Sequence, residues 1–126
     1  MDSLIPPNLI PPRLRVLCRL DDIPDGGAKG FPAATLGSAG LFAVRQGDRV
    51  FVYVNACPHI GISLDWLPDR FLSADGRLIV CSTHGAEFRI ADGVCLRGPC
   101  HGDALEAVPV TIDANRTLMV AEGAGL

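Results

Sequence analysis

The 126-residue chain has room for one domain of ordinary size, and its 48% hydrophobic and 20% charged residues exclude intrinsic disorder. The net charge of −3 offers no basic surplus to a nucleic acid, so no nucleic-acid partner is expected. Gly 14 and Pro 10 make the chain rich in turns, which favours many short strands over a few long helices.

Residues 1–13 are predicted to form an extended N-terminal arm, because four prolines interrupt a stretch without charges. This stretch is too short to span a bilayer and is a poor signal peptide. No later stretch has 18 consecutive apolar residues, so no membrane partner is expected either. Without a recognisable export signal, the five cysteines indicate metal or redox chemistry rather than a disulfide framework, and the cytoplasm is the expected location.

Turn signals divide residues 14–122 into short segments with strand-like patterns. The predicted strands are 14–20, 41–45, 50–54, 71–73, 77–80, 87–90, 94–96, 106–112 and 117–121. Gln46-Gly47-Asp48 and the pairs Asp75-Gly76 and Asp92-Gly93 are typical of tight hairpin turns, which need positive φ angles. No segment of ten residues shows an uninterrupted helical period. We therefore predict a small all-β domain.

Cysteine and histidine occur together in two short segments, each directly after a predicted strand. Cys57-Pro58-His59 follows the strand at 50–54, and Cys81-Ser82-Thr83-His84-Gly85 follows the strand at 77–80. Each loop supplies one soft thiolate and one imidazole, and both loops can direct these ligands at one metal site. Spacing alone leaves two kinds of centre open, because two cysteines and two histidines also make a structural zinc site.

At this point the chain resembles the Rieske 2Fe-2S proteins, whose signature is a C-x-H loop and a C-x-x-H-G loop. The resemblance continues through Gly85-Ala86-Glu87-Phe88, Asp92-Gly93 and Gly98-Pro99, which match the family's second ligand loop, its hairpin and its proline loop. It covers roughly residues 14 to 122, which leaves a short tail at 123–126. It implies a Rieske-like all-β fold of small antiparallel sheets, with two cluster-binding loops and a Gly-Pro loop.

The resemblance also implies the cofactor and its ligands. These are one 2Fe-2S cluster per chain, with Cys57 and Cys81 on one iron and His59 and His84 on the other. Two neutral imidazoles in place of two thiolates make the site less negative, which places such centres at about −150 to +300 mV, above plant-type ferredoxins.

Four positions depart from the high-potential members of the family. Those members join the two ligand loops by a disulfide, but Ile62 and Thr83 stand at the matching places. The same members direct a Ser and a Tyr hydroxyl at the cluster sulfurs, where this chain has Ala86 and Phe88. Each lost donor leaves the added negative charge of the reduced cluster less stabilised. The pattern resembles the low-potential, soluble ferredoxin branch.

The implied function is that of a one-electron carrier, a Rieske ferredoxin that takes an electron from a reductase. The terminal acceptor is an oxidoreductase, and a ring-hydroxylating oxygenase is the best-precedented acceptor in the family. An enzyme is not expected. Once the four ligands are assigned, only His101, expected on an exposed loop, remains to build a nucleophile–base pair. Residues 26–30 lack the spacing of a phosphate loop, and the chain has no room for the iron-bearing catalytic domain of Rieske oxygenases.

Two alternatives from other classes stay open: a structural Cys2His2 zinc-binding module, and a small subunit permanently docked to an oxidoreductase. Three further features have their own expectations. Cys18 is expected to be a small buried apolar residue. Cys95 and Cys100 bracket the proline loop, and a disulfide between them is not favoured in a reducing cytoplasm. Trp66, on an unusually long loop at 64–70, is expected to cap a hydrophobic cluster, with a docking aromatic as the alternative.

Overall fold

A computed structural model describes residues 13–33, 39–58, 64, 70–82 and 85–124 of the chain. The elements in these ranges are β1 (Leu14–Arg19), η3 (Leu20–Asp22), β2 (Ala28–Phe31), β3 (Leu41–Gln46), β4 (Arg49–Val54), β5 (Leu78–Val80), β6 (Glu87–Arg89), β7 (Cys95–Arg97), β8 (Ala107–Val108), β9 (Thr111–Ile112) and β10 (Thr117–Ala121). No α-helix occurs in the described ranges. The expected all-β fold of short strands is confirmed.

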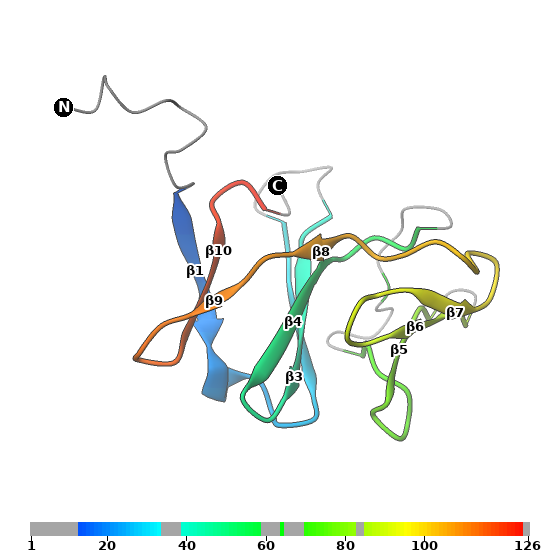
Figure 1. The fold of residues 1–126 in the computed structure, drawn as a ribbon, viewed down its shortest axis with the longest axis horizontal. Helices are drawn as coiled ribbons and strands as arrows, with labels where there is room; N and C mark the ends of the chain where they lie inside the picture. Colours follow the sequence, from blue (N-terminus) through cyan, green and yellow to red (C-terminus); the bar gives the residue numbers. More distant parts are fainter. Residues whose placement is uncertain (1–12, 34–38, 59–63, 65–69, 83–84, 125–126) are drawn as a thin grey trace.

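The strands form three small antiparallel sheets, with the orders β1-β10-β9, β2-β3-β4-β8 and β5-β6-β7. Figure 1 shows the four-stranded sheet in the middle, the sheet of β1, β10 and β9 at one end and the sheet of β5, β6 and β7 at the other. The strand β4, which leads to the first Cys-His segment, belongs to the middle sheet. The strand β5, which leads to the second segment, belongs to the end sheet.

Two of the predicted hairpins form around the expected turn residues, whereas the segment 71–73 is not a strand and pairs with β5 only through an isolated bridge between Leu72 and Ile79. β3 and β4 stay in register as far as Gln46 and Arg49, which leaves Gly47-Asp48 as a two-residue turn with Gly47 at φ +64°. In the β6–β7 connection, the Asp92 side chain accepts a hydrogen bond from the Val94 amide at 3.1 Å, and Gly93 has φ +73°. These turns set the strand register locally, because only a residue without Cβ enters this backbone region at little cost.

Two features of the middle sheet differ from the sequence prediction. The segment 106–112 is two strands rather than one, because β8 pairs with β4 whereas β9 pairs with β10 in another sheet. Pro109, which lies between them, has no N–H to continue a ladder. The strand β2 was not predicted, since its sequence Ala-Lys-Gly-Phe has little intrinsic strand preference, and its pairing with β3 supplies the stabilisation.

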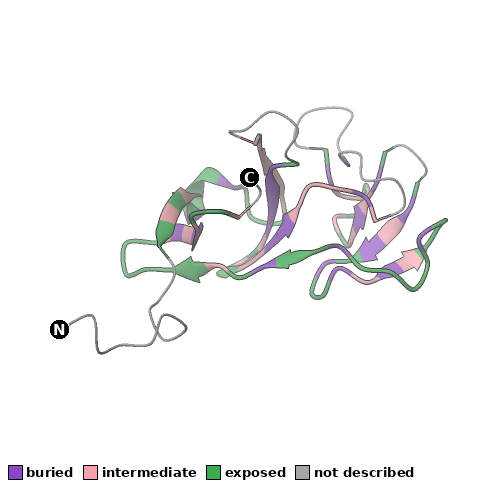
Figure 2. Cartoon of the chain, turned by 90° about the horizontal axis from the view of Figure 1, so that it is seen from above, coloured by how far each residue is buried: buried purple, intermediate pink, exposed green. Residues whose placement is uncertain are grey.

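Buried side chains form two hydrophobic cores, one on each side of the middle sheet. The first core contains Phe42, Val44, Tyr53, Cys57, Leu64, Phe71, Ile79, Cys81, Ala86, Phe88, Ile90, Cys95, Cys100 and Leu105. The second core contains Leu20, Ile23, Leu41, Ala43, Val52, Val108, Leu118 and Val120. Successive residues of β3 enter the two cores alternately, because strand side chains alternate between the faces of a sheet. Figure 2 shows the buried residues along these middle strands and the β5-β6-β7 sheet.

Tyr53 is the one hydroxyl-bearing residue of the first core, and it donates a hydrogen bond to the backbone carbonyl of Ile90. Burial, with a smaller contribution from the charge of Asp92, raises the pKa of Tyr53 to about 12. The variant Tyr53→Phe is expected to lower the free energy of unfolding by about 1–3 kcal/mol, because the Ile90 carbonyl loses this donor inside the core.

The raised pKa also predicts a pH dependence. The folded state holds the Tyr53 proton more tightly than the unfolded state, so this stabilisation is complete below pH 10 and is lost as the pH rises toward 12. Denaturant unfolding at pH 7 and above pH 10 measures both effects, and the alkaline loss should be smaller in Tyr53→Phe. Equal stability of the two proteins at pH 7 would show that the hydrogen bond contributes nothing.

Candidate metal centre

The first Cys-His segment begins where β4 leaves the middle sheet. The Asn55 amide donates to the Gly40 carbonyl at 3.1 Å, which holds the end of β4 beside the segment that precedes β3. Cys57 follows with only 1% of its surface exposed. The side-chain carbonyl of Asn55 then accepts a hydrogen bond from the Leu64 amide at 2.9 Å. Asn55 therefore ties together the two ends of the loop that carries Cys57.

The second segment is a tight loop at the end of β5. The Cys81 amide donates to the Ala86 carbonyl at 2.9 Å, and the Gly85 amide donates to the Cys81 carbonyl at 2.9 Å. The positive φ of Gly85, +68°, lets the chain return into β6 within a few residues. Cys81 and Ala86 are both completely buried. The backbone thus fixes the position of Cys81 by two hydrogen bonds to its own peptide groups.

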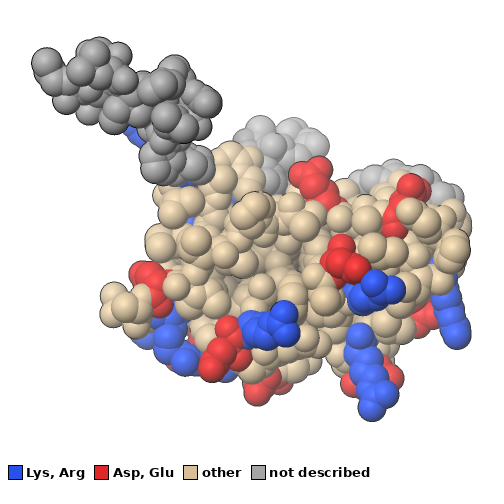
Figure 3. Space-filling view, in the orientation of Figure 1, with Lys and Arg blue, Asp and Glu red and all other residues tan. Residues whose placement is uncertain are grey.

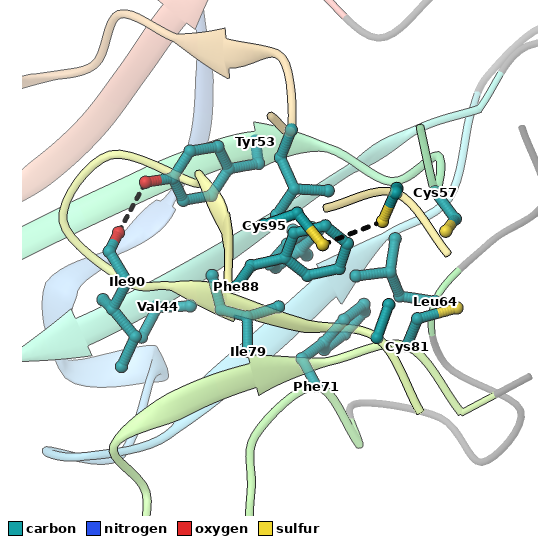
Figure 4. Packing of buried hydrophobic residues seen from close by; sticks show 14 residues of the cluster. Val44, Tyr53, Cys57, Leu64, Phe71, Ile79, Cys81, Phe88, Ile90 and Cys95 are labelled. Carbon is teal, nitrogen blue, oxygen red and sulfur yellow. Dashed lines mark hydrogen bonds between the residues drawn. The ribbon is translucent and has the colours of Figure 1, made fainter. Parts of the chain in front are cut away.

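Leu64 joins the two loops. Its amide donates to Asn55 in the first loop, its carbonyl accepts from the Ser82 amide of the second loop at 3.0 Å, and its side chain is completely buried. Figure 4 shows Cys57 and Cys81 at the same end of the first core, on the side of Leu64. The two predicted cysteine ligands, 24 residues apart in the sequence, are therefore brought into one apolar cluster.

The proline loop packs directly against the second ligand loop. Gly98 has φ +106°, and a Cβ placed there would lie 2.8 Å from the Cα of Ala86. The turn is closed by hydrogen bonds from the His101 amide to the Gly98 carbonyl at 3.1 Å and from the Asp103 amide to the Cys100 carbonyl at 2.9 Å. The expected Gly-Pro loop therefore lies beside the candidate site.

Cys95 and Cys100 are free thiols in this loop, each only 2% exposed. The Cys100 thiol donates to the Cys95 sulfur at 3.0 Å, and the Cys95 thiol donates to the Arg97 carbonyl at 3.2 Å. Burial, with smaller contributions from the neighbouring Cys95 and Cys57, raises the pKa of Cys100 to about 12. Cys100 therefore keeps its proton at neutral pH, and the two thiols are separate in the structure.

The two described cysteines, Cys57 and Cys81, fit an iron–sulfur centre. Cys57 and Cys81 lie in a core that contains no buried charged side chain among the described residues. Two thiolates in such a core need a compensating cation, and soft sulfur ligands favour iron–sulfur clusters or zinc. His59 and His84 lie outside the described residues, and within the described ranges no group of three potential ligands occurs.

The other residues named in the sequence analysis also lie partly inside and partly outside the described ranges. Ala86 and Phe88 are completely buried and bring no hydroxyl to the site. His101 is exposed, as predicted, whereas Cys18 is only half-buried and packs against the second core. Ile62, Thr83 and Trp66 also lie outside the described residues.

Sequence reasoning missed the roles of Asn55 and Leu64. Asn55 stands directly after a strand, where its side chain is well placed to cap backbone amides, and this was the available signal. Leu64 gave no comparable signal, because its importance lies in two backbone hydrogen bonds to segments distant in the sequence.

Comparison with known proteins agrees with this geometry. The family model of the Rieske [2Fe-2S] domain matches residues 14–111, so the chain belongs to this family, whose cofactor is a 2Fe-2S cluster. No curated protein sequence matches the chain. Among helices of the described residues, none has the length and apolar character needed to cross a bilayer.

Solved structures of similar fold include two ferredoxins. The ferredoxin of carbazole 1,9a-dioxygenase from Nocardioides aromaticivorans IC177 is 26% identical with a TM-score of 0.67, over 86% of this chain and 96% of that chain. The ferredoxin of Sphingomonas yanoikuyae B1 is 25% identical with a TM-score of 0.66, over 87% and 99%. A chain in the complex of reduced oxygenase and oxidised ferredoxin in carbazole 1,9a-dioxygenase is 25% identical with a TM-score of 0.67, over 86% and 92%.

Proposed function

We propose that this protein is a one-electron carrier, a Rieske ferredoxin that passes electrons from a reductase to a ring-hydroxylating oxygenase. The observation that carries the proposal is the match to ferredoxins along nearly their whole length, 96% and 99% of the two chains. The ferredoxin of carbazole 1,9a-dioxygenase supports an oxygenase as the acceptor class. The proposed domain limits are 14–122 for the Rieske domain, with an arm at 1–13 and a tail at 123–126.

The proposed ligands are Cys57 and Cys81 on one iron and His59 and His84 on the other. When bound, the cluster supplies one-electron redox chemistry at a potential set by its surroundings. Cys57 and Cys81 are held by backbone hydrogen bonds of their loops and by Leu64, and the apolar first core keeps water from their sulfur atoms. The protein's own contribution is to position the ligands and to control the polarity around them.

We propose that the chain has no catalytic residue of its own and acts as a component of an oxidoreductase system. His101, the only histidine in the described part of the chain, is exposed. A reducing compartment, the cytoplasm, is part of the proposal, and the unbridged pair Cys95 and Cys100 supports it.

The described surface is compatible with protein partners. In Figure 3 the basic and acidic side chains are interspersed on the visible face rather than gathered by sign. Such a face offers no continuous basic surface to a nucleic acid, in line with the net charge of −3.

The proposal is tested with anaerobically purified protein. We expect a red-brown chromophore that a ferredoxin reductase bleaches and that a ring-hydroxylating oxygenase reoxidises, at a rate that rises with oxygenase concentration in a stopped-flow experiment. A colourless protein that binds one zinc ion would contradict the proposal and would instead indicate a structural Cys2His2 zinc-binding module. Co-elution with an oxidoreductase at nanomolar concentration in gel filtration would instead indicate a permanently docked subunit.

The reduction potential gives a separate prediction, because Ala86 and Phe88 cannot donate hydrogen bonds to sulfur. We expect a wild-type midpoint in the lower part of the Rieske range, about −150 to 0 mV. Ala86→Ser and Phe88→Tyr should each raise it by about 20–90 mV, which corresponds to about 0.5–2 kcal/mol per added donor.

Protein-film voltammetry at pH 7 measures these midpoints. Ala43→Ser is the matched control, because Ala43 is equally buried but lies in the second core. A wild-type midpoint above about +200 mV would contradict the prediction.

A further inference from the structure

The proline loop places two cysteine thiols directly against each other. The Cys100 thiol donates to the Cys95 sulfur at 3.0 Å, and this contact is the dashed line that leaves the Cys95 sulfur in Figure 4. Both thiols are free, and both residues are only 2% exposed. The sulfur atoms of a disulfide are about 2.05 Å apart, so this pair needs an approach of roughly 1 Å to form one.

The backbone holds both cysteines in place through one shared residue, Asp103. The Cys95 amide donates to the Asp103 carbonyl at 2.8 Å, and the Asp103 amide donates to the Cys100 carbonyl at 2.9 Å. Cys95 also pairs with Phe88 in the ladder between β6 and β7. The two sulfur atoms therefore meet because the fold fixes both backbones, and the contact does not depend on one flexible side chain.

The chain around Cys100 is exposed although Cys100 itself is buried. Residues 97–99 and 101–104, on both sides of this cysteine, are all exposed. Exposed loops open locally at a much smaller cost in free energy than the unfolding of the whole domain. A small reagent can therefore reach the two thiols when this stretch opens, while the strands of the sheets stay paired.

Loss of the two thiol protons would leave little unpaired in the loop. The Cys95 thiol donates to the Arg97 carbonyl at 3.2 Å, and the Cys100 thiol donates only to the Cys95 sulfur. Thiols are weak donors. The one oxygen that loses a partner is the carbonyl of Arg97, an exposed residue, where water can replace the thiol.

We propose that Cys95 and Cys100 are a redox-active pair, which a low-molecular-weight disulfide such as oxidised glutathione converts reversibly into a bridge across the proline loop. In a reducing compartment the pair stays as two thiols, and an oxidising shift closes the bridge. The pair goes beyond the proposed electron transfer, because it requires no cluster.

The exchange takes place in two steps. One cysteine sulfur attacks a sulfur of the small disulfide, whose S–S bond breaks, and a mixed disulfide forms while one small thiol leaves with the cysteine proton. The second cysteine sulfur then attacks the first, the mixed S–S bond breaks, and the second small thiol leaves with the second proton. Two electrons pass from the cysteine pair to the small disulfide, which is reduced to two thiols.

The bridge restrains a loop that lies directly on the second ligand loop. A Cβ on Gly98 would lie 2.8 Å from the Cα of Ala86, and the pair belongs to the same core as Cys57 and Cys81. A cross-link removes open conformations of the chain it closes. Water and chelators therefore reach the proposed ligands less often when the bridge is closed. This consequence, unlike the bridge itself, rests on the proposed ligation by Cys57 and Cys81.

Trypsin makes the bridge directly detectable, because it cuts after Arg97, between the two cysteines. The products are the peptides 90–97 and 98–116. The cluster-loaded protein is equilibrated anaerobically in glutathione buffers of increasing oxidised fraction, then unfolded in an alkylating reagent, digested and examined by mass spectrometry. We expect two separately alkylated peptides in reduced glutathione and one joined pair in oxidised glutathione. Return to reduced glutathione should restore the separate peptides.

The second measurement is the rate of cluster loss to a chelator, followed by visible absorption in both buffers. We expect this rate to be about three- to tenfold lower for the bridged wild-type protein than for the reduced one. Cys95→Ser and Cys100→Ser each remove one partner, so neither should give joined peptides or a rate that depends on the buffer. Cys18→Ser, in a cysteine that packs against the second core, should behave as the wild type.

The wild-type protein alone decides the inference. Separately alkylated peptides in oxidised glutathione, or cysteines that each carry glutathione without a joined pair, would overturn it. Joined peptides with equal rates of cluster loss in the two buffers would overturn the clamping of the ligand loop. A colourless wild-type protein would show that the proposed function is wrong, and the peptides would still show whether the bridge forms.

Discussion

Replacement of Cys57 or Cys81 by serine is expected to give a colourless protein without bound iron or sulfide. Both cysteines lie in the apolar first core, with 1% and 0% of their surface exposed, and no charged side chain is buried among the described residues. A serine hydroxyl is a harder ligand than a thiolate and is a poor substitute on a cluster iron. Visible absorption together with iron and sulfide analysis of the anaerobically purified variants measures the loss.

Cys18→Ser is the matched control, because it makes the same chemical change at a half-buried cysteine that packs against the second core. It should keep the wild-type spectrum. For the two proposed histidine ligands, His59→Cys and His84→Cys are expected to retain a cluster at lower potential, since each adds negative charge. Wild-type iron, sulfide and spectrum in all four ligand variants would show that the assigned ligands are wrong.

The second large effect is expected for Gly98→Ala in the proline loop. A methyl group at this position would lie 2.8 Å from the Cα and 3.0 Å from the Cβ of Ala86, both fixed atoms of the second ligand loop. The backbone of Gly98, at φ +106°, is also one that residues with a side chain rarely adopt. We expect the free energy of unfolding to fall by about 2–5 kcal/mol, the sum of backbone strain and overpacking.

Gly102→Ala separates the two contributions. Gly102 has a similar backbone, φ +95°, but a Cβ there would meet no atom within 4 Å. The free energy of unfolding of Gly102→Ala should therefore fall only by the cost of backbone strain, about 1–2 kcal/mol. Denaturant unfolding measures the stabilities, and the rate of cluster loss on exposure to a chelator measures the coupling to the site. If Gly98→Ala and Gly102→Ala were equally stable, the proline loop would not be packed against Ala86 as described.

Several features of the protein follow from local sequence. The strands β1, β3, β4 and β10 lie where alternating or β-branched segments predict them. The hairpins turn at Asp-Gly and Gly-Asp pairs, because the residues of a turn determine its backbone angles without help from the rest of the chain. The spacing of Cys57 and Cys81 after two strands likewise predicted a shared site, and the structure places both in the first core.

Other features were decided by tertiary contacts that no local pattern records. The segment 106–112 divides between two sheets because β4 and β10 each offer an edge to it, and β2 forms because β3 offers another. Leu64 joins the ligand loops, because its amide donates to the side-chain carbonyl of Asn55 and its carbonyl accepts from the Ser82 amide. Only the fold brings these groups near one another.

The same holds for the two thiols of the proline loop. The sequence shows that Cys95 and Cys100 are close along the chain, and it shows the absence of hydroxyls at Ala86 and Phe88. Only the folded structure shows that the Cys95 thiol is directed at the Arg97 carbonyl and the Cys100 thiol at the Cys95 sulfur. Candidate ligands can be proposed from residue type and spacing in the sequence. The direction of a hydrogen bond depends on the positions of side chains from separate segments, which are set by packing.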